Sequence, residues 1–172
     1  MLRRKFLFLA LATSLPYFSW AQTTSSKPIK IIVPFAPGGG NDVIARQLAK
    51  DLSELRKQTV LVENKPGAGG NIGTEYVVRA SADEITLLLG HTGTVSINPV
   101  LLNTGMDPTR DLEPIALLAS TSLVLVVAQD SKIKSVQNLI ELSSQRTIPF
   151  NYGSSGNGTG GHLTGELFKE VT

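Results

Sequence analysis

Hydrophobic and polar residues alternate in blocks along the chain, and these blocks predict strands that alternate with helices. Ile29–Val33 is a short, nearly continuous run of β-branched residues, which is typical of a strand buried on both faces. Asn41 is predicted to cap the helix that follows. The apolar face of that helix is predicted to consist of Ile44, Leu48, Leu52 and Leu55.

The same order of elements recurs further along the chain. Residues 60–63 and 85–89 form two more apolar runs, and a helix is predicted to begin between them at Asn71. Its buried side is predicted to consist of Ile72, Tyr76 and Val77. Apolar strands with helices between them indicate a parallel sheet with right-handed crossovers, so the predicted fold class is α/β.

The remaining part of the chain has a different pattern. A helical turn is predicted near residues 99–102, and a polar turn over residues 107–111. Residues 115–119 and 123–128 have the composition of strands but are only three residues apart, too few for a crossover helix. We expect one extended segment that passes between two lobes. Three elements are predicted after it: a helix that Ser135 caps and that runs to about Ser144, a strand over residues 148–152, and a last helix over residues 163–170.

The amino terminus has the features of an export signal. Three basic residues at positions 3–5 precede the apolar run 6–15, and Ser19 and Ala21 are small residues at the positions that a signal peptidase recognises. Cleavage after Ala21 removes three of the 16 basic residues and none of the 14 acidic ones, so the net charge changes from +2 to −1. We therefore expect an exported, periplasmic protein that is soluble after cleavage and does not bind nucleic acid. A short membrane anchor is the alternative.

Few residues are suited to catalysis or to metal binding. The 172 residues include no cysteine, which excludes disulfides, thiol catalysis and cysteine zinc sites. His91 and His162 are the only histidines, and Ser154 and Ser155 lack the G-x-S-x-G pattern of serine hydrolases. We expect no enzyme activity, no metal and no cofactor.

Glycines are concentrated in three loops, each between a predicted strand and a predicted helix. Twelve of the 16 lie in residues 38–40, 67–73 and 153–161. In an open α/β sheet such loops lie at the carboxyl ends of the strands, where the amino ends of helices bind anions. Glycines that serve only to make tight turns are the alternative for each loop. Hydroxyl and amide side chains accompany the glycines: Asn71, Thr92, Thr94, Ser154, Ser155, Asn157 and Thr159.

One loop also resembles a nucleotide-binding motif. Residues 156–161 match G-x-G-x-x-G after a predicted strand, but the acidic residue expected about 20 positions later does not occur in this sequence. Residues 38–40 are not followed by the lysine of a P-loop. A nucleotide-binding enzyme fragment that uses residues 156–161 remains an alternative.

Several segments resemble the Bug/TctC family, the substrate-binding receptors of tripartite tricarboxylate transporters. They are KPIKIIVPFAPGGGND (27–42), VENKPGAGGNIG (62–73), TGT with INP (92–99), NYGSSGNGT (151–159) and HLTGELF (162–168). The resemblance covers nearly all of the chain after the export signal. It implies a two-lobed fold like that of the type II periplasmic binding proteins, with parallel-rich sheets flanked by helices.

The resemblance also implies a domain organisation and a function. Residues 1–21 would be the signal peptide, residues 22–120 the first lobe and residues 121–172 the beginning of a second, incomplete lobe. The receptor would capture a small carboxylate (a tricarboxylate, a dicarboxylate or an amino acid) for the membrane subunits of a transporter. By resemblance, ligand-binding residues from the first lobe are Phe35, Ala36, Gly38, Gly39, Gly40, Gly67, Ala68, Gly69, Gly70, Asn71, His91, Thr92, Gly93 and Thr94. Those from the second lobe are Ser154, Ser155, Gly156, Asn157, Gly158, Thr159 and His162.

The length of the chain differs from what the resemblance implies. Receptors of this family run to roughly twice this size, with the chain returning to complete the first lobe. We therefore expect a truncated receptor, and a remnant that binds no ligand is a further alternative.

Overall fold

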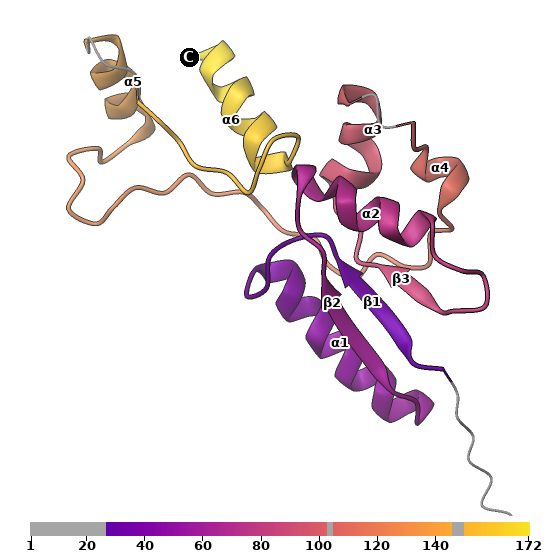
Figure 1. Cartoon of the computed structure of the whole chain (residues 1–172). Coiled ribbons are helices and arrows are strands. Elements are labelled where there is room, and N and C mark those ends of the chain that lie inside the picture. The colour runs from indigo at the N-terminus through magenta and orange to yellow at the C-terminus, as the bar shows by residue number, and fades with distance from the viewer. Residues whose placement is uncertain (1–26, 103–104, 146–149) are drawn as a thin grey trace, which may run out of the picture.

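The computed structural model describes residues 27–102, 105–145 and 150–172 (Figure 1). The predicted signal peptide, residues 1–21, lies outside these residues. The elements follow in the order β1 (Ile29–Val33), α1 (Gly40–Arg56), β2 (Val60–Asn64), the 3₁₀ turn η1 (Ala68–Gly70), α2 (Asn71–Val78), β3 (Thr86–Leu88), the π-helical turn η2 (Gly93–Ile97), α3 (Asn98–Leu101), α4 (Pro108–Asp111), α5 (Val136–Ser144) and α6 (Gly160–Val171).

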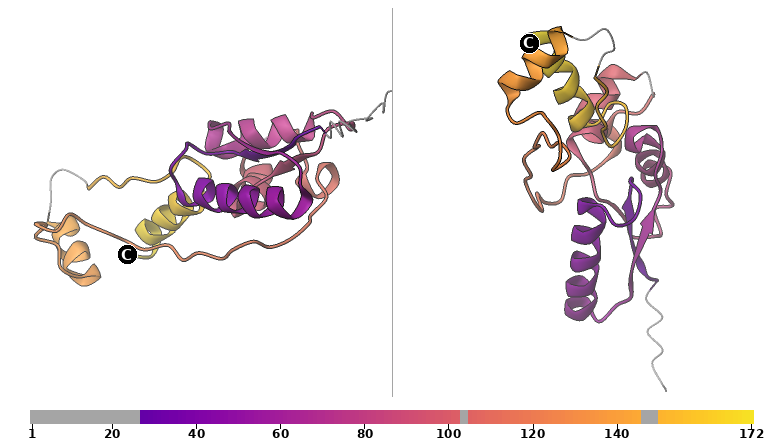
Figure 2. Two further views of the ribbon diagram at one scale, coloured as in Figure 1. Left: turned by 90° about the horizontal axis from the view of Figure 1, so that it is seen from below. Right: turned by 90° about the vertical axis from the view of Figure 1, so that its left-hand side faces the viewer.

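A parallel sheet with the strand order β2-β1-β3 forms the centre of the fold. The central strand β1 pairs with β2 from Ile29 opposite Val60, and with β3 from Lys30 opposite Thr86. Helices α1 and α2 lie on opposite faces of the sheet (Figure 2). This arrangement buries the apolar side chains of β1, as in Val33, which has no exposed surface. The predicted α/β class and the three predicted parallel strands are confirmed.

Helix α1 differs from the sequence prediction at both ends. Its cap is Gly39, and Asn41 lies inside the first turn. Ala45 and Ala49 are buried against the sheet, whereas Leu55 is 80% exposed. The 17 residues of α1 span about 26 Å, and the five of β1 about 17 Å, so the last turn of the helix extends past the strand.

Helix α2 buries a different face from the predicted one. Ile72 and Tyr76 are 53% and 39% exposed, and Gly73 and Thr74 are buried instead. A Cβ atom at Gly73 would lie only 2.8 Å from Cα of Pro34, so α2 packs too closely on the end of β1 to admit a large side chain. Close backbone packing, rather than hydrophobicity, decides which side of α2 faces the sheet.

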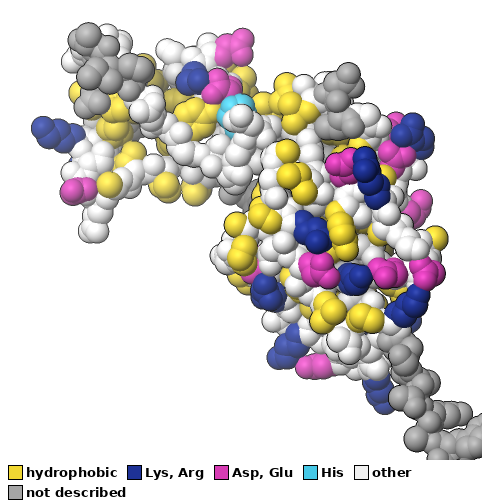
Figure 3. All heavy atoms as spheres, in the orientation of Figure 1, with side chains coloured by type: hydrophobic (Ala, Val, Ile, Leu, Met, Phe, Trp, Pro, Cys, Tyr) yellow, Lys and Arg dark blue, Asp and Glu magenta, His cyan; other side chains and the backbone are white. Residues whose placement is uncertain are grey.

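The two strands predicted over residues 115–119 and 123–128 are not formed. This segment is extended, as predicted, but no other described segment pairs with it. A strand needs a neighbour for its backbone N–H and C=O groups, and here the apolar side chains stay exposed, as with Leu117 (89%) and Val124 (80%). Apolar side chains are correspondingly visible at the surface of the part of the chain that leads to α5, while charges of both signs are interspersed over the sheet-bearing part (Figure 3).

The predicted helices of the carboxyl-terminal part are present. Ser135 caps α5 by accepting a hydrogen bond from the Asn138 N–H (3.0 Å), and α5 ends at Ser144 as predicted. Helix α6 begins at Gly160, three residues before the predicted start. The strand predicted over residues 148–152 lies partly outside the described residues, and residues 150–152 are not in a strand. None of the described helices is long and apolar enough to cross a membrane.

Candidate functional site

The loop from β1 to α1, residues 35–40, is held by a buried carboxylate. Asp42 is 4% exposed. Its side chain accepts hydrogen bonds from the Gly38 N–H, from Arg46 Nε and from Asn64 Nδ2, each 2.9 Å long. The Arg46 guanidinium, followed by the Gly38 N–H and the Asn64 amide, holds the pKa of Asp42 well below its usual range. The negative charge of Asp42 thus lies at the positive end of α1 and fixes the loop.

The loop from β2 to α2, residues 67–71, has an unusual backbone. Four successive residues, Gly67 to Gly70, have positive φ angles of 131°, 47°, 62° and 99°. This conformation brings Gly70 against two other loops, because a Cβ atom there would lie 2.4 Å from Thr94 Cγ2 and 3.3 Å from Phe35 Cζ. Only glycine has both the conformational freedom and the small size that this contact needs.

The loop after β3, residues 91–94, is organised by a neutral histidine. Nδ1 of His91 accepts a hydrogen bond from the Gly93 N–H (3.0 Å), and the backbone carbonyl oxygen of His91 accepts one from the Thr94 hydroxyl (2.9 Å). Burial lowers the pKa of His91, which favours the uncharged ring that this acceptor role requires. The ring also meets the Phe35 ring edge to face, with centroids 5.4 Å apart.

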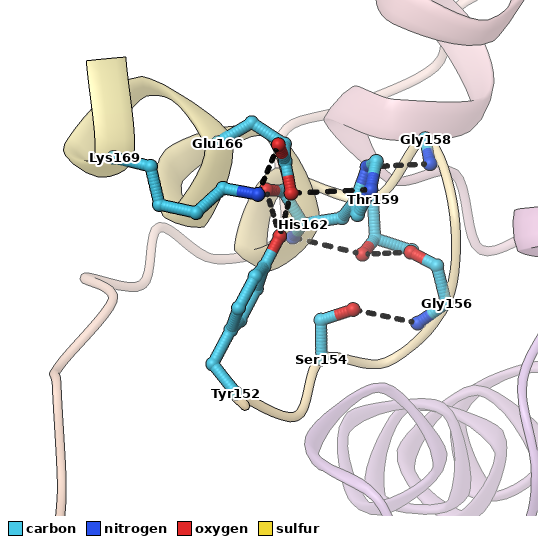
Figure 4. A network of polar contacts seen from close by, with 8 residues as sticks. All are labelled: Tyr152, Ser154, Gly156, Gly158, Thr159, His162, Glu166 and Lys169. Atoms are coloured by element: carbon cyan, nitrogen blue, oxygen red, sulfur yellow. Dashed lines mark hydrogen bonds and ion pairs between the residues drawn. The ribbon is translucent and has the colours of Figure 1, made fainter. Parts of the chain in front are cut away.

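The loop before α6, residues 154–159, wraps around the amino end of that helix (Figure 4). The Thr159 hydroxyl donates to the Gly156 carbonyl oxygen (2.6 Å) and accepts from the His162 N–H (3.4 Å). The Gly156 N–H donates to Ser154 Oγ and the Gly158 N–H to His162 Nδ1, each at 3.4 Å. The loop therefore satisfies much of its own polar backbone.

A second group of polar side chains supports this loop from α6. The Tyr152 hydroxyl donates to Glu166 (2.6 Å), which also pairs with Lys169 (2.5 Å). Lys169, followed by Tyr152, lowers the pKa of Glu166. These side chains converge beside the loop, to its left in Figure 4, and tie Tyr152, which precedes the loop, to the helix that follows it.

The four loops come together although they are far apart in sequence, and loop 35–40 takes part through Phe35, which contacts Gly70 and His91. A Cβ atom at Gly69 would lie 2.2 Å from the Asn157 carbonyl oxygen, and one at Gly93 would lie 2.9 Å from that of Gly158. Loop 154–159 thus contacts both loop 67–71 and loop 91–94 through backbone atoms. Gly38 and Gly40 stand apart, because a Cβ atom at either would meet no described atom within 4 Å. Ala36, Ser154 and Ser155 are exposed.

Two hollows on the described surface can be compared with these loops. The one of about 230 Å³ is lined by Ala68, Asn71, Ile72, Glu75 and Met106, and so shares two residues with the predicted site. A larger, open one of about 620 Å³ lies between α1 and β2 and shares no residue with the four loops. Position relative to the loops, rather than size, therefore identifies the candidate site.

Asn98 is a site residue that the sequence prediction did not include. It is fully buried, and its Nδ2 donates to the Gly69 carbonyl oxygen (3.2 Å) and to Asn71 Oδ1 (2.9 Å). It thereby joins α3 to loop 67–71. Its place in the INP segment beside loop 91–94 was the only signal in the sequence. No group of three or more potential metal ligands occurs in the described part of the chain.

Comparison with known proteins identifies the family. Residues 44–172 match the model of the tripartite tricarboxylate transporter family receptor, TctC. Two relatives from Bordetella pertussis are a UPF0065 protein, 37% identical over 149 residues, and protein BugT, 36% identical over 155 residues. Each match covers 87% of this chain and 46% of the relative, so the chain spans about half the length of these curated relatives.

Solved structures give the same result. A periplasmic transporter matches with a TM-score of 0.79 and 37% identity, covering 86% of this chain and 50% of the other. The periplasmic binding protein BugD matches with a TM-score of 0.70 and 34% identity, covering 84% of this chain and 48% of BugD. R. palustris Rpa4515 with adipate matches with a TM-score of 0.68 and 32% identity, covering 86% of this chain and 50% of the other. The fold is thus that of a periplasmic binding protein, and the family is described as a receptor rather than an enzyme. The chain belongs to the tripartite tricarboxylate transporter receptor (TctC) family.

Proposed function

We propose that this chain carries the carboxylate-binding loops of a periplasmic receptor that delivers a small carboxylate to the membrane subunits of a tripartite transporter. The observation that carries the proposal is the meeting of loops 67–71, 91–94 and 154–159 beside the amino ends of α2 and α6. Helix amino ends and glycine-rich backbone favour a negatively charged ligand. No cofactor is part of the proposal.

The chemistry of these loops suits reversible binding. They contain backbone amides, hydroxyl groups and a neutral histidine, but no arginine or lysine. Hydrogen bonds from neutral donors hold a carboxylate less tightly than a paired guanidinium does, and this favours release to a transporter. Since loop 154–159 contacts the other two loops directly, we propose that the ligand enters when this loop moves away from them.

The domain organisation and location belong to the same proposal. Residues 22–120 would form the first lobe, residues 121–172 would begin the second, and residues 1–21 would direct export. The periplasmic descriptions of the related structures and the adipate in one of them support this assignment.

Calorimetry on the full chain tests the proposal. We expect succinate, adipate or citrate to bind, and NAD to give no heat. Gly70→Ala should weaken binding at least about tenfold, because the added methyl group meets Thr94 and separates the loops. Gly105→Ala is the matched control, since Gly105 also has a positive φ (69°) but no atom of the described residues lies within 4 Å of its Cβ position.

The outcome that contradicts the proposal is equally specific. Absence of binding by every carboxylate tested would refute it. Binding of NAD in its place would favour the nucleotide-binding alternative for residues 156–161.

A further inference from the structure

The side-chain oxygen of Asn98 has no hydrogen-bond donor among the described residues. The amide orientation is fixed, because the Gly69 carbonyl oxygen can only accept a hydrogen bond and must therefore face Nδ2. Nδ2 makes two hydrogen bonds, while Oδ1, on a residue with no exposed surface, makes none. A buried acceptor without a donor is costly and calls for a specific explanation.

The loop that covers this oxygen supplies no donor. A Cβ atom at Gly158 would lie 2.1 Å from Asn98 Oδ1, so the backbone of Gly158 packs closely against this oxygen. The N–H of Gly158 donates to His162 Nδ1 instead (3.4 Å; Figure 4). Movement of loop 154–159 away from the other loops would open Oδ1 to a donor from outside the protein.

The surroundings of Asn98 Oδ1 indicate what kind of molecule carries that donor. Asn98 is bonded to Asn71, the first residue of α2, and Oδ1 faces Gly158, which directly precedes the cap of α6 at Thr159. The oxygen is thus placed between two helix amino ends, which attract negative charge. A ligand that satisfies the whole site has a carboxylate for the helix ends and, close to it, an O–H or N–H group for Oδ1.

We propose that Asn98 Oδ1 accepts a hydrogen bond from a hydroxyl or ammonium group on the carbon next to the bound carboxylate, so that the site selects 2-hydroxy or 2-amino acids. This assignment rests on the proposed function and specifies the ligand class at the same site. A carboxylate without such a donor leaves Oδ1 unsatisfied and binds more weakly.

Three probes of the same carbon skeleton test the assignment by calorimetry on the full chain. Succinate has no donor beside its carboxylates, malate carries a hydroxyl there and aspartate an ammonium. We expect malate or aspartate to bind at least about fivefold more tightly than succinate, as one additional hydrogen bond predicts. The affinity ratio is the measured quantity, because a general weakening of the fold lowers all three affinities together.

Variants assign the preference to Asn98. Asn98→Leu should reduce the ratio to about one, whereas Asn98→Asp, which keeps an acceptor oxygen, should retain the preference for aspartate even if all affinities fall. Thr86→Val is the matched control, since Thr86 Oγ1 is the other buried side-chain atom without a partner in the described residues and lies in β3. It should leave the ratio unchanged. If Asn98→Leu does not fold, the ratio of aspartate to succinate affinity in Asn98→Asp decides between the outcomes: a retained preference supports the assignment and a lost preference overturns it.

The failures of the two proposals are distinguishable. Equal binding of the three probes, or a preference that survives Asn98→Leu, overturns the Asn98 assignment and leaves the carboxylate-binding function intact. If none of the three probes binds, the Asn98 assignment is refuted, and the proposed function is refuted with it only if adipate and citrate also fail to bind.

Discussion

Replacement of Gly73 by alanine tests the close packing that connects α2 to the site. A Cβ atom at Gly73 would lie 2.8 Å from both Cα and Cβ of Pro34 and 2.9 Å from the Lys65 carbonyl oxygen. Two of these atoms are backbone, at the ends of β1 and β2, and cannot rotate away. Helix α2 would have to move off the sheet and take loop 67–71 with it.

The expected change in the free energy of unfolding is the difference of two opposing effects. Overpacking of this kind costs about 1–3 kcal/mol, and the upper end applies where backbone atoms block relaxation. Alanine in place of glycine stabilises a helix by about 1 kcal/mol. The net loss for Gly73→Ala is then about 2 kcal/mol, which lowers the melting temperature of a chain of this size by about 4–8 °C.

Thermal and urea unfolding, followed by far-ultraviolet circular dichroism, measure this loss. Gly161→Ala is the matched control, because Gly161 also lies within a helix and its Cβ position has only an ordinary contact, 3.8 Å from Ser154 Cβ. There the helix-forming gain is unopposed, and a small increase in stability is expected. If Gly73→Ala matched or exceeded the unsubstituted chain in both melting temperature and urea midpoint, the reasoning about close packing would be wrong.

Three further measurements test other parts of the structure. The pKa of Asp42 is lower in the folded chain than its ordinary value of 3.8, so its stabilisation is complete above about pH 4 and is lost as the pH falls toward the lowered pKa. The urea concentration at the unfolding midpoint should fall as the pH is lowered, and Asp42→Asn should make this fall smaller. An equally large fall in the variant would contradict the stabilising role of the Asp42 carboxylate. The pKa of His91, measured by NMR, should lie below its ordinary value of 6.5. Protonation of the ring at lower pH should break the hydrogen bond from the Gly93 N–H to Nδ1 and weaken ligand binding. A measured pKa of 6.5 or higher would contradict the assigned role of His91. Ile31→Ala, in the centre of the sheet, should lower the free energy of unfolding, measured with urea, by about 2–5 kcal/mol. Leu55→Ala, at a mostly exposed position, should lower it by less than about 0.5 kcal/mol. Similar losses for the two variants would mean that the core is elsewhere.

Local chemistry made most of the elements predictable. The strand β1, the helix cap at Ser135 and the helix start at Asn71 depend on residues within a few positions of one another. The glycine loops were predictable in the same way, because their composition and their place between strand and helix are visible in the sequence.

Tertiary packing decided what local pattern could not. Hydrophobicity predicted that Ile72 faces inward, but the close approach of α2 to Pro34 leaves room only for Gly73 on that side. Residues 123–128 have the composition of a strand, but a strand requires a neighbour to pair with, and no described segment supplies one.

The amino-acid sequence by itself determined the order of the elements, the α/β class and the glycine-rich loops, because each depends on interactions between near neighbours in the chain. Only the tertiary structure decided that Asn98 and Gly158 meet with an unsatisfied oxygen between them. Sixty positions separate these residues, so their contact depends on how the whole chain packs and leaves no local pattern in the sequence.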